Sequence, residues 1–217
     1  MKYLIPIILK HYPKDFLKDY FEDLKNVYNA KNTTSTLLLL TEITKGDHQR
    51  RMPIHIVKIV IYKLLEEAIF NGIFKNFEEL YDRVKDILST IPFAQGPLTT
   101  YDIALKIGAL LNISPHDYLY LADTTSKVFS LVYSNTNPTT KNFKGKVDIS
   151  YAQKIFGNTL NSADIEIILC IFKDCFKRRL DGECISEEEI KDIIKKKYPK
   201  KIDWDNVRTK AKRYGVL

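Results

Sequence analysis

The stretch Ile91–Asn112, IPFAQGPLTTYDIALKIGALLN, has the pattern of a helix end, a tight turn and a second helix. Pro92 cannot continue a preceding helix, and Gly96 can adopt a positive φ in a tight turn. Thr99 or Thr100 then offers a hydroxyl that can cap the first backbone N–H groups of a new helix. Apolar residues recur at helical spacing after these threonines, which predicts a buried helix face. We therefore expect a helical protein built around this turn.

The same stretch resembles the helix-hairpin-helix, with which DNA glycosylases and other repair proteins hold a DNA backbone. The usual hairpin reads apolar-Pro-Gly-apolar-Gly. Gly96 matches the second glycine, Ala94 stands in the place of the first, and Gln95 stands in the place of the apolar residue. The resemblance implies that N–H groups of the turn bind phosphate beside a helix N-terminus. An ordinary turn between two core helices is the alternative.

The catalytic part of this resemblance is incomplete. Lyase-type glycosylases place a lysine two residues after the second glycine, whereas this chain has Leu98 there, so Schiff-base chemistry is not implied. Asp102 is a candidate acid–base residue. The alternative for Asp102 is a carboxylate that stabilises the start of its helix through the helix dipole.

Two further blocks are similar to a bacterial family of uncharacterised proteins. The blocks are Tyr101–Ala109, YDIALKIGA, and Ile165–Lys173, IEIILCIFK. The family has no known activity. The resemblance implies only that the two segments belong to one fold.

Positive charge is concentrated at the C-terminal end of the chain. The net charge is +7, and the segment Lys195–Leu217 has nine basic and two acidic residues, while the rest of the chain is balanced. Such a distribution predicts a nucleic-acid partner, which we expect to be duplex DNA. Of the 34 basic residues 27 are lysine, in a chain rich in Ile, Asn and Tyr, so genome base composition is an alternative origin of the excess.

Three groups of residues are candidates for DNA contact: the hairpin turn, the polar loop after Thr44, and the last helix. The last helix and the helix before it resemble a helix-turn-helix in outline. For the loop and the last helix, cations that only face water are the alternative. The candidates are Gly96, Thr99 and Thr100 in the turn, Lys45, Arg50 and Arg51 in the loop, and Arg208, Lys210, Lys212 and Arg213 in the last helix.

Several classes of function lack their usual signatures. The chain has no Gly-x-Gly-x-x-Gly or Gly-x-x-x-x-Gly-Lys motif, and its three cysteines and four histidines have no metal-site spacing. We therefore expect neither a cofactor nor a metal. The odd cysteine count and the absence of a signal-peptide pattern predict a cytoplasmic protein. No apolar run approaches the roughly 20 residues that span a bilayer, so no membrane association is expected.

The apolar periodicity predicts an all-α fold of about nine helices, a bundle around the Phe77–Leu111 hairpin with a basic helical C-terminus. We expect a domain 1–150 containing the hairpin and a C-terminal part 151–217, or a single domain. A polar loop is expected at Ser134–Lys146. The expected helices are Asp15–Tyr28, Thr33–Thr44, Pro53–Phe70 ended by a left-handed Gly72, Phe77–Ser89, Tyr118–Val132 opened by Ser114 and Pro115, Tyr151–Phe156, Ser162–Arg179, Glu187–Lys197 capped by Ser186, and Asp203–Tyr214 closed by Gly215.

These observations lead to one main hypothesis and two alternatives. The main one is a DNA-binding protein of helix-hairpin-helix type, related to DNA repair and without an assigned reaction. The first alternative is a helical protein-interaction module with a protein partner. The second is a DNA-glycosylase-like enzyme without the lyase lysine.

Overall fold

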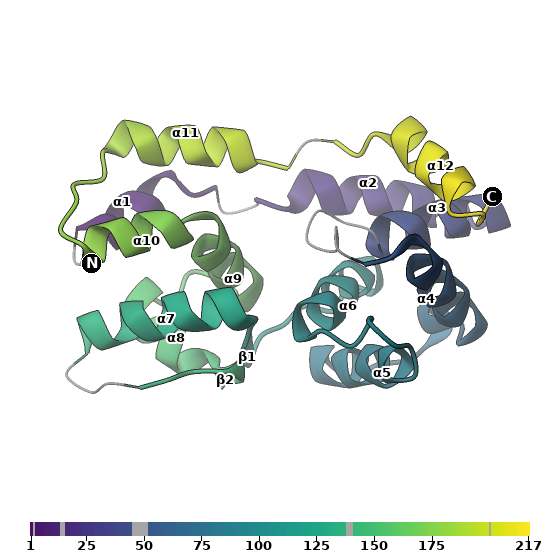
Figure 1. Ribbon diagram of the computed structural model, residues 1–217, viewed down its shortest axis with the longest axis horizontal. Coiled ribbons are helices and arrows are strands. Elements are labelled where there is room, and N and C mark those ends of the chain that lie inside the picture. The colour runs from purple at the N-terminus through teal and green to yellow at the C-terminus, as the bar shows by residue number, and fades with distance from the viewer. Residues whose placement is uncertain (2, 14–15, 45–51, 138–140, 200) are drawn as a thin grey trace. The chain divides into compact units, whose positions relative to one another are not determined.

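The computed structural model describes residues 1, 3–13, 16–44, 52–137, 141–199 and 201–217 (Figure 1). Over these residues the chain is mostly helical, with twelve α-helices, one short 3-10 helix and one two-stranded sheet, which confirms the helical fold class. In chain order the elements are α1 (Leu4–His11), α2 (Lys18–Tyr28), α3 (Thr33–Thr44), α4 (Ile54–Glu66), η2 (Ile69–Asn71), α5 (Phe77–Ser89), α6 (Pro97–Leu111), β1 (Tyr118–Leu121), α7 (Asp123–Thr136), β2 (Gly145–Asp148), α8 (Ile149–Phe156), α9 (Ser162–Ile171), α10 (Lys173–Leu180), α11 (Glu187–Lys197) and α12 (Trp204–Arg213).

Close packing divides the chain into two compact units, each made of two separate segments. Unit 1 is Met1–Leu17 with Pro115–Pro199, and unit 2 is Lys18–Ser114 with Lys200–Leu217. These limits differ from the expected boundary near residue 150, a position that falls inside α8. Each unit is completed by a terminal segment that is distant in sequence, and local patterns do not reveal such pairings.

In unit 2, α5 and α6 form the expected antiparallel hairpin. The Asn76 side chain caps α5 by accepting a hydrogen bond from the Glu79 N–H at 3.0 Å. Buried Leu80 and Val84 lie on the inner face of α5, which packs against α6. The spacing of apolar residues therefore predicted both bounds of α5 correctly.

The turn that joins these helices differs from the prediction. Gly96 has φ −68° and ψ 136°, an extended conformation, so it does not need the freedom of glycine. Gly96 itself is the N-cap of α6, and neither Thr99 nor Thr100 caps it; the buried Thr100 hydroxyl instead donates to the Gly96 carbonyl at 3.2 Å. The positive φ of the turn, 65°, belongs to Phe93. The helix α6 therefore begins at Pro97, before the two threonines that were expected to cap it.

A second glycine prediction was also wrong. The helix expected at Pro53–Phe70 ends at Glu66, and η2 follows it. The left-handed residue between them is Ala68, with φ 45°, while Gly72 has φ −67°. Alanine has no intrinsic preference for this conformation, and Ile69, which follows it, is buried.

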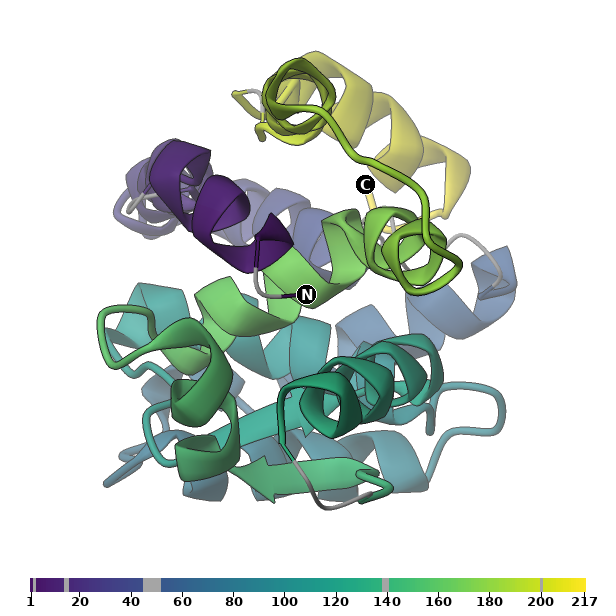
Figure 2. The same cartoon turned by 90° about the vertical axis from the view of Figure 1, so that its left-hand side faces the viewer.

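Unit 1 contains the largest departure from the expected helices. Tyr118–Leu121 is strand β1, not the start of a helix opened by Ser114 and Pro115, and β2 begins at Gly145, inside the end of the expected polar loop. The two strands are antiparallel, with Leu119 opposite Val147, and they lie side by side in Figure 2. Leu119 and Leu121 contribute to the core of unit 1, and Tyr120 between them is buried as well. Pairing with a distant segment has overridden the local helical signal.

Of the other helices of unit 1, α1 was not predicted, and α8, α9 and α10 cover predicted helical segments with changed bounds. The helix expected at Ser162–Arg179 is broken at the buried Phe172 into α9 and α10, and its N-cap is Asn161, not Ser162. The bounds of α11 agree with the prediction, and the Ser186 hydroxyl accepts the Glu189 N–H at 3.1 Å, which confirms Ser186 as the N-cap.

Candidate nucleic-acid interface

The last helix, α12, is attached to unit 2 by a small apolar contact. Val207 and Ala211 are buried against Leu38 of α3. Asp203 caps the helix by accepting the Asn206 N–H at 3.0 Å, and Gly215, at φ 65°, closes it as predicted. Four-residue spacing of the buried side chains fixes which face of α12 points outward.

The outward side of α12 is basic. Arg208, Lys212 and Arg213 are exposed, and Lys210 is half-buried. Within the described part of the chain, none of these four side chains forms an ion pair. We call Arg208, Lys212 and Arg213 the α12 basic face. Its charge is available to an external anion because no carboxylate of the described residues neutralises it.

The structure does not bring the hairpin turn and α12 together. The turn lies between α5 and α6, whereas α12 packs against α3, and α5 and α12 are on opposite sides of unit 2 (Figure 1). Gly96 is exposed, Thr99 is half-buried and Thr100 is buried. Lys45, Arg50 and Arg51 lie outside the described residues.

Asp102 does not lie at the open start of a helix. It is in the second turn of α6, half-buried, and takes part in an interaction with a neighbouring group. Among the described residues, no three His, Cys, Asp or Glu side chains gather as a metal ion would require.

Sequence reasoning missed a second basic surface, around β2 and α8 in unit 1. Four exposed lysines belong to it: Lys141, Lys144, Lys146 and Lys154. The Lys146 ammonium lies 3.9 Å from the centroid of the Tyr118 ring, and the Lys141 ammonium lies 3.8 Å from that of Tyr151. Only the pairing of β1 with β2 places Tyr118 beside Lys146, so no local pattern could have revealed it. Because lysines cover these ring faces, the surface suits phosphate better than stacked bases.

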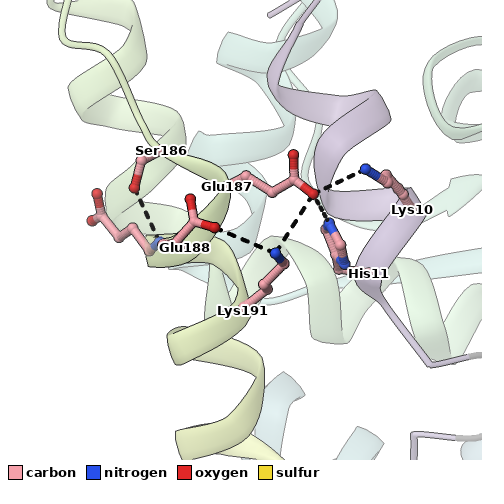
Figure 3. Close-up of polar contacts among 7 residues, drawn as sticks. Lys10, His11, Ser186, Glu187, Glu188 and Lys191 are labelled. Carbon is pink, nitrogen blue, oxygen red and sulfur yellow. Dashed lines mark hydrogen bonds and ion pairs between the residues drawn. The ribbon is translucent and has the colours of Figure 1, made fainter.

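The densest group of charged side chains lies where α1 meets the start of α11 (Figure 3). Glu187 Oε1 is 2.9 Å from Lys10 Nζ and 2.5 Å from His11 Nε2. Lys191 Nζ is 3.8 Å from the same oxygen and 3.4 Å from Glu188 Oε1. Hydrogen bonds from Lys10 and His11 lower the pKa of Glu187 to about 2.

This cluster joins two helices instead of forming an open anion site. Its lysines face a carboxylate, so their charge is balanced locally. The next glutamate of the same turn, Glu189, is hydrogen-bonded to Arg178 of α10 at 2.5 Å, and Arg178 also binds Glu183 at 2.7 Å. The start of α11 is thus held by ion pairs to both α1 and α10.

No protein-family model, no curated protein and no solved structure matches this chain. The resemblances to helix-hairpin-helix proteins and to the bacterial family therefore stay predictions. None of the described helices has the length and apolarity needed to cross a bilayer.

Proposed function

We propose that this protein binds duplex DNA, with the α12 basic face as its main contact to phosphates. The observation that carries the proposal is that α12 has three exposed cations without an ion pair among the described residues and only one acidic residue, whereas α11 has four acidic residues. The inner side of the helix is seated on α3 by Val207 and Ala211. A helix held in this way presents its charges at fixed spacing to a phosphate backbone.

The kind of binding follows from the residues present. Arginine and lysine neutralise phosphates and release counterions, which makes affinity strongly salt-dependent. The α12 basic face supplies positive charge along about 7.5 Å of helix, which is short enough to lie in or across a groove. We expect affinity that depends little on base sequence, because phosphate contacts position a protein without reading bases. A link to DNA repair rests on the hairpin resemblance alone.

The test compares two sets of three charges. The first variant is Arg208→Gln, Lys212→Gln and Arg213→Gln in α12. The control is Lys195→Gln, Lys196→Gln and Lys197→Gln at the end of α11, where three exposed lysines are also neutralised. Both variants lose three positive charges, so net charge alone predicts equal effects.

Fluorescence anisotropy with labelled duplex DNA over a range of salt concentrations gives the readout. The α12 variant should lower the log–log salt slope by up to about 2.7, since each phosphate contact contributes about 0.9. The α11 control should keep most of the slope, with circular dichroism showing that both variants are folded. Equal losses in the two variants would point to diffuse attraction by net charge and would reject α12 as the contact surface.

A further inference from the structure

The outer side of α4 carries apolar side chains that water contacts. The inner residues Val57, Val60, Ile61 and Leu64 are fully buried in unit 2, as expected for a core helix. The outer residues are apolar as well, although a helix that is hydrophobic on all sides is normally covered. The exposed fractions are 39% for Ile54, 48% for Ile59, 42% for Tyr62 and 37% for Leu65.

Charge is arranged symmetrically about the centre of this outer face. Lys58, Tyr62 and Glu66 follow one another at intervals of four residues, so they form one line along the helix. Ile59 and Leu65 stand three residues before and after Tyr62. The face therefore has a cation at one end, an anion at the other and an apolar middle.

We propose that a second copy of this chain docks on α4, with the two α4 helices antiparallel and related by a twofold axis at Tyr62. This arrangement places Lys58 opposite Glu66 of the partner subunit, and Glu66 opposite the partner's Lys58. It also packs Ile59 on the partner's Leu65, so the same face is complementary to itself, as a twofold interface requires. A parallel pair would set like charges against each other.

Lys58 and Glu66, the two ends of this line of residues, can both pair with a second copy of the chain. Lys58 forms no ion pair among the described residues, and its ammonium lies 5.9 Å from the centroid of the Tyr62 ring. Glu66 pairs with Lys63 at 3.0 Å, and Lys63 is also 3.7 Å from Glu67. Lys63 can therefore keep Glu67 as its partner when Glu66 turns to the second copy.

The size of the contact predicts a weak dimer. A helix of 13 residues is about 20 Å long, and a single helix pair falls at the small end of specific interfaces. We therefore expect self-association that depends on protein concentration. It requires no DNA, and its test is separate from that of the α12 basic face.

The experiment uses two charge reversals of the full chain, Lys58→Glu and Glu66→Lys, in sedimentation velocity without DNA. Each variant alone places like charges at both ends of the antiparallel pair, so dimerisation should weaken by roughly tenfold or more. An equimolar mixture restores two opposite-charge pairs and should form heterodimers at the strength of the parent protein. Lys85→Glu, a reversal at an exposed position of α5, is the control and should leave dimerisation unchanged.

Three results would overturn the proposal, provided that circular dichroism shows folded variants. The first is a parent protein that stays monomeric at roughly 1 mM, where even very weak pairs associate. The second is a dimer that tolerates both reversals. The third is a mixture that associates no better than either variant, because no other occupant of this face predicts rescue by mixing.

Discussion

The helices α11 and α12 contain equal numbers of basic residues but differ in what surrounds them. Each has four basic residues, while α11 has four acidic residues and α12 has one. The glutamates of α11 bind Lys10, His11 and Arg178 of unit 1. The α12 basic face has no such partner among the described residues. Along the sequence the two helices form one basic tail, yet the tail is divided between two units.

The difference shows that charged residues can either form ion pairs within the fold or attract an external anion. Exposed ion pairs stabilise a fold only weakly, but they cancel the field that would attract a distant anion. In α11 the acidic start and basic end also oppose the helix dipole, which favours helix formation. In α12 three of the four cations also lie in the last turn, but only one acidic residue precedes them, so most of their charge is not cancelled within the helix. A count of lysines and arginines therefore overestimates the positive surface that is available to an external anion.

The largest expected effect is a loss of folding stability when the buried side of α11 is truncated. Ile190 is fully buried in the core of unit 1, so Ile190→Ala should cost about 2–5 kcal/mol in the free energy of unfolding. Ile193→Ala at a half-buried position should cost less and serves as the control. Urea unfolding gives both values. If the folded Ile190→Ala protein also lost DNA affinity as strongly as the α12 variant, the distinction between the two helices would fail.

A smaller effect is expected at the ion-pair cluster of α11. The folded-state pKa of Glu187, about 2, is below its ordinary value of 4.5, so the charged carboxylate stabilises the fold fully above about pH 4.5. That contribution is lost as the pH falls through about 2. Glu187→Gln should therefore unfold at a lower temperature than the parent near neutral pH, and the difference should disappear toward pH 2.

Glu188→Gln is the matched control for this pH experiment. Glu188 lies in the same helical turn, so it has the same relation to the helix dipole, but among the described residues it pairs only with Lys191. Melting temperatures across the pH range should change less for this variant. A parent-minus-Glu187→Gln difference that persists unchanged to pH 2 would show that the carboxylate charge is not what joins α1 to α11.

The smallest effect is expected from a substitution at Gly96. This substitution tests whether the hairpin turn, instead of α12, contacts DNA. An added Cβ at Gly96 would meet only the Thr99 hydroxyl at 3.6 Å, and φ is already −68°. Gly96→Ala should therefore cost less than about 1 kcal/mol, the usual difference between N-cap residues, and should leave DNA affinity unchanged. Gly108→Ala is the contrast, because its Cβ would lie 2.5 Å from the Ile113 carbonyl oxygen and should lower the melting temperature clearly. A loss of DNA affinity in Gly96→Ala would restore the hairpin as a contact.

Local interactions made part of the fold predictable from sequence. The bounds of α3, α5 and α11 agree with the prediction, and Ser186 caps α11 as its position suggested. These features depend on residues three or four positions apart, which a sequence shows directly. The conformations of two turns were predicted wrongly: Gly96 is extended, and Ala68, not Gly72, is left-handed.

The sequence by itself determined that the chain is helical, that its C-terminal end is basic, and that Arg208, Lys212 and Arg213 share a helix. Tertiary structure alone decided that Tyr118–Leu121 is a strand, because its partner β2 lies more than twenty residues away. Tertiary structure also decided which cations stay unpaired: Lys10 and Arg178 meet glutamates from another helix, and the α12 basic face does not. Helix formation needs neighbours along the chain, whereas strand pairing and charge neutralisation need partners that only folding brings together.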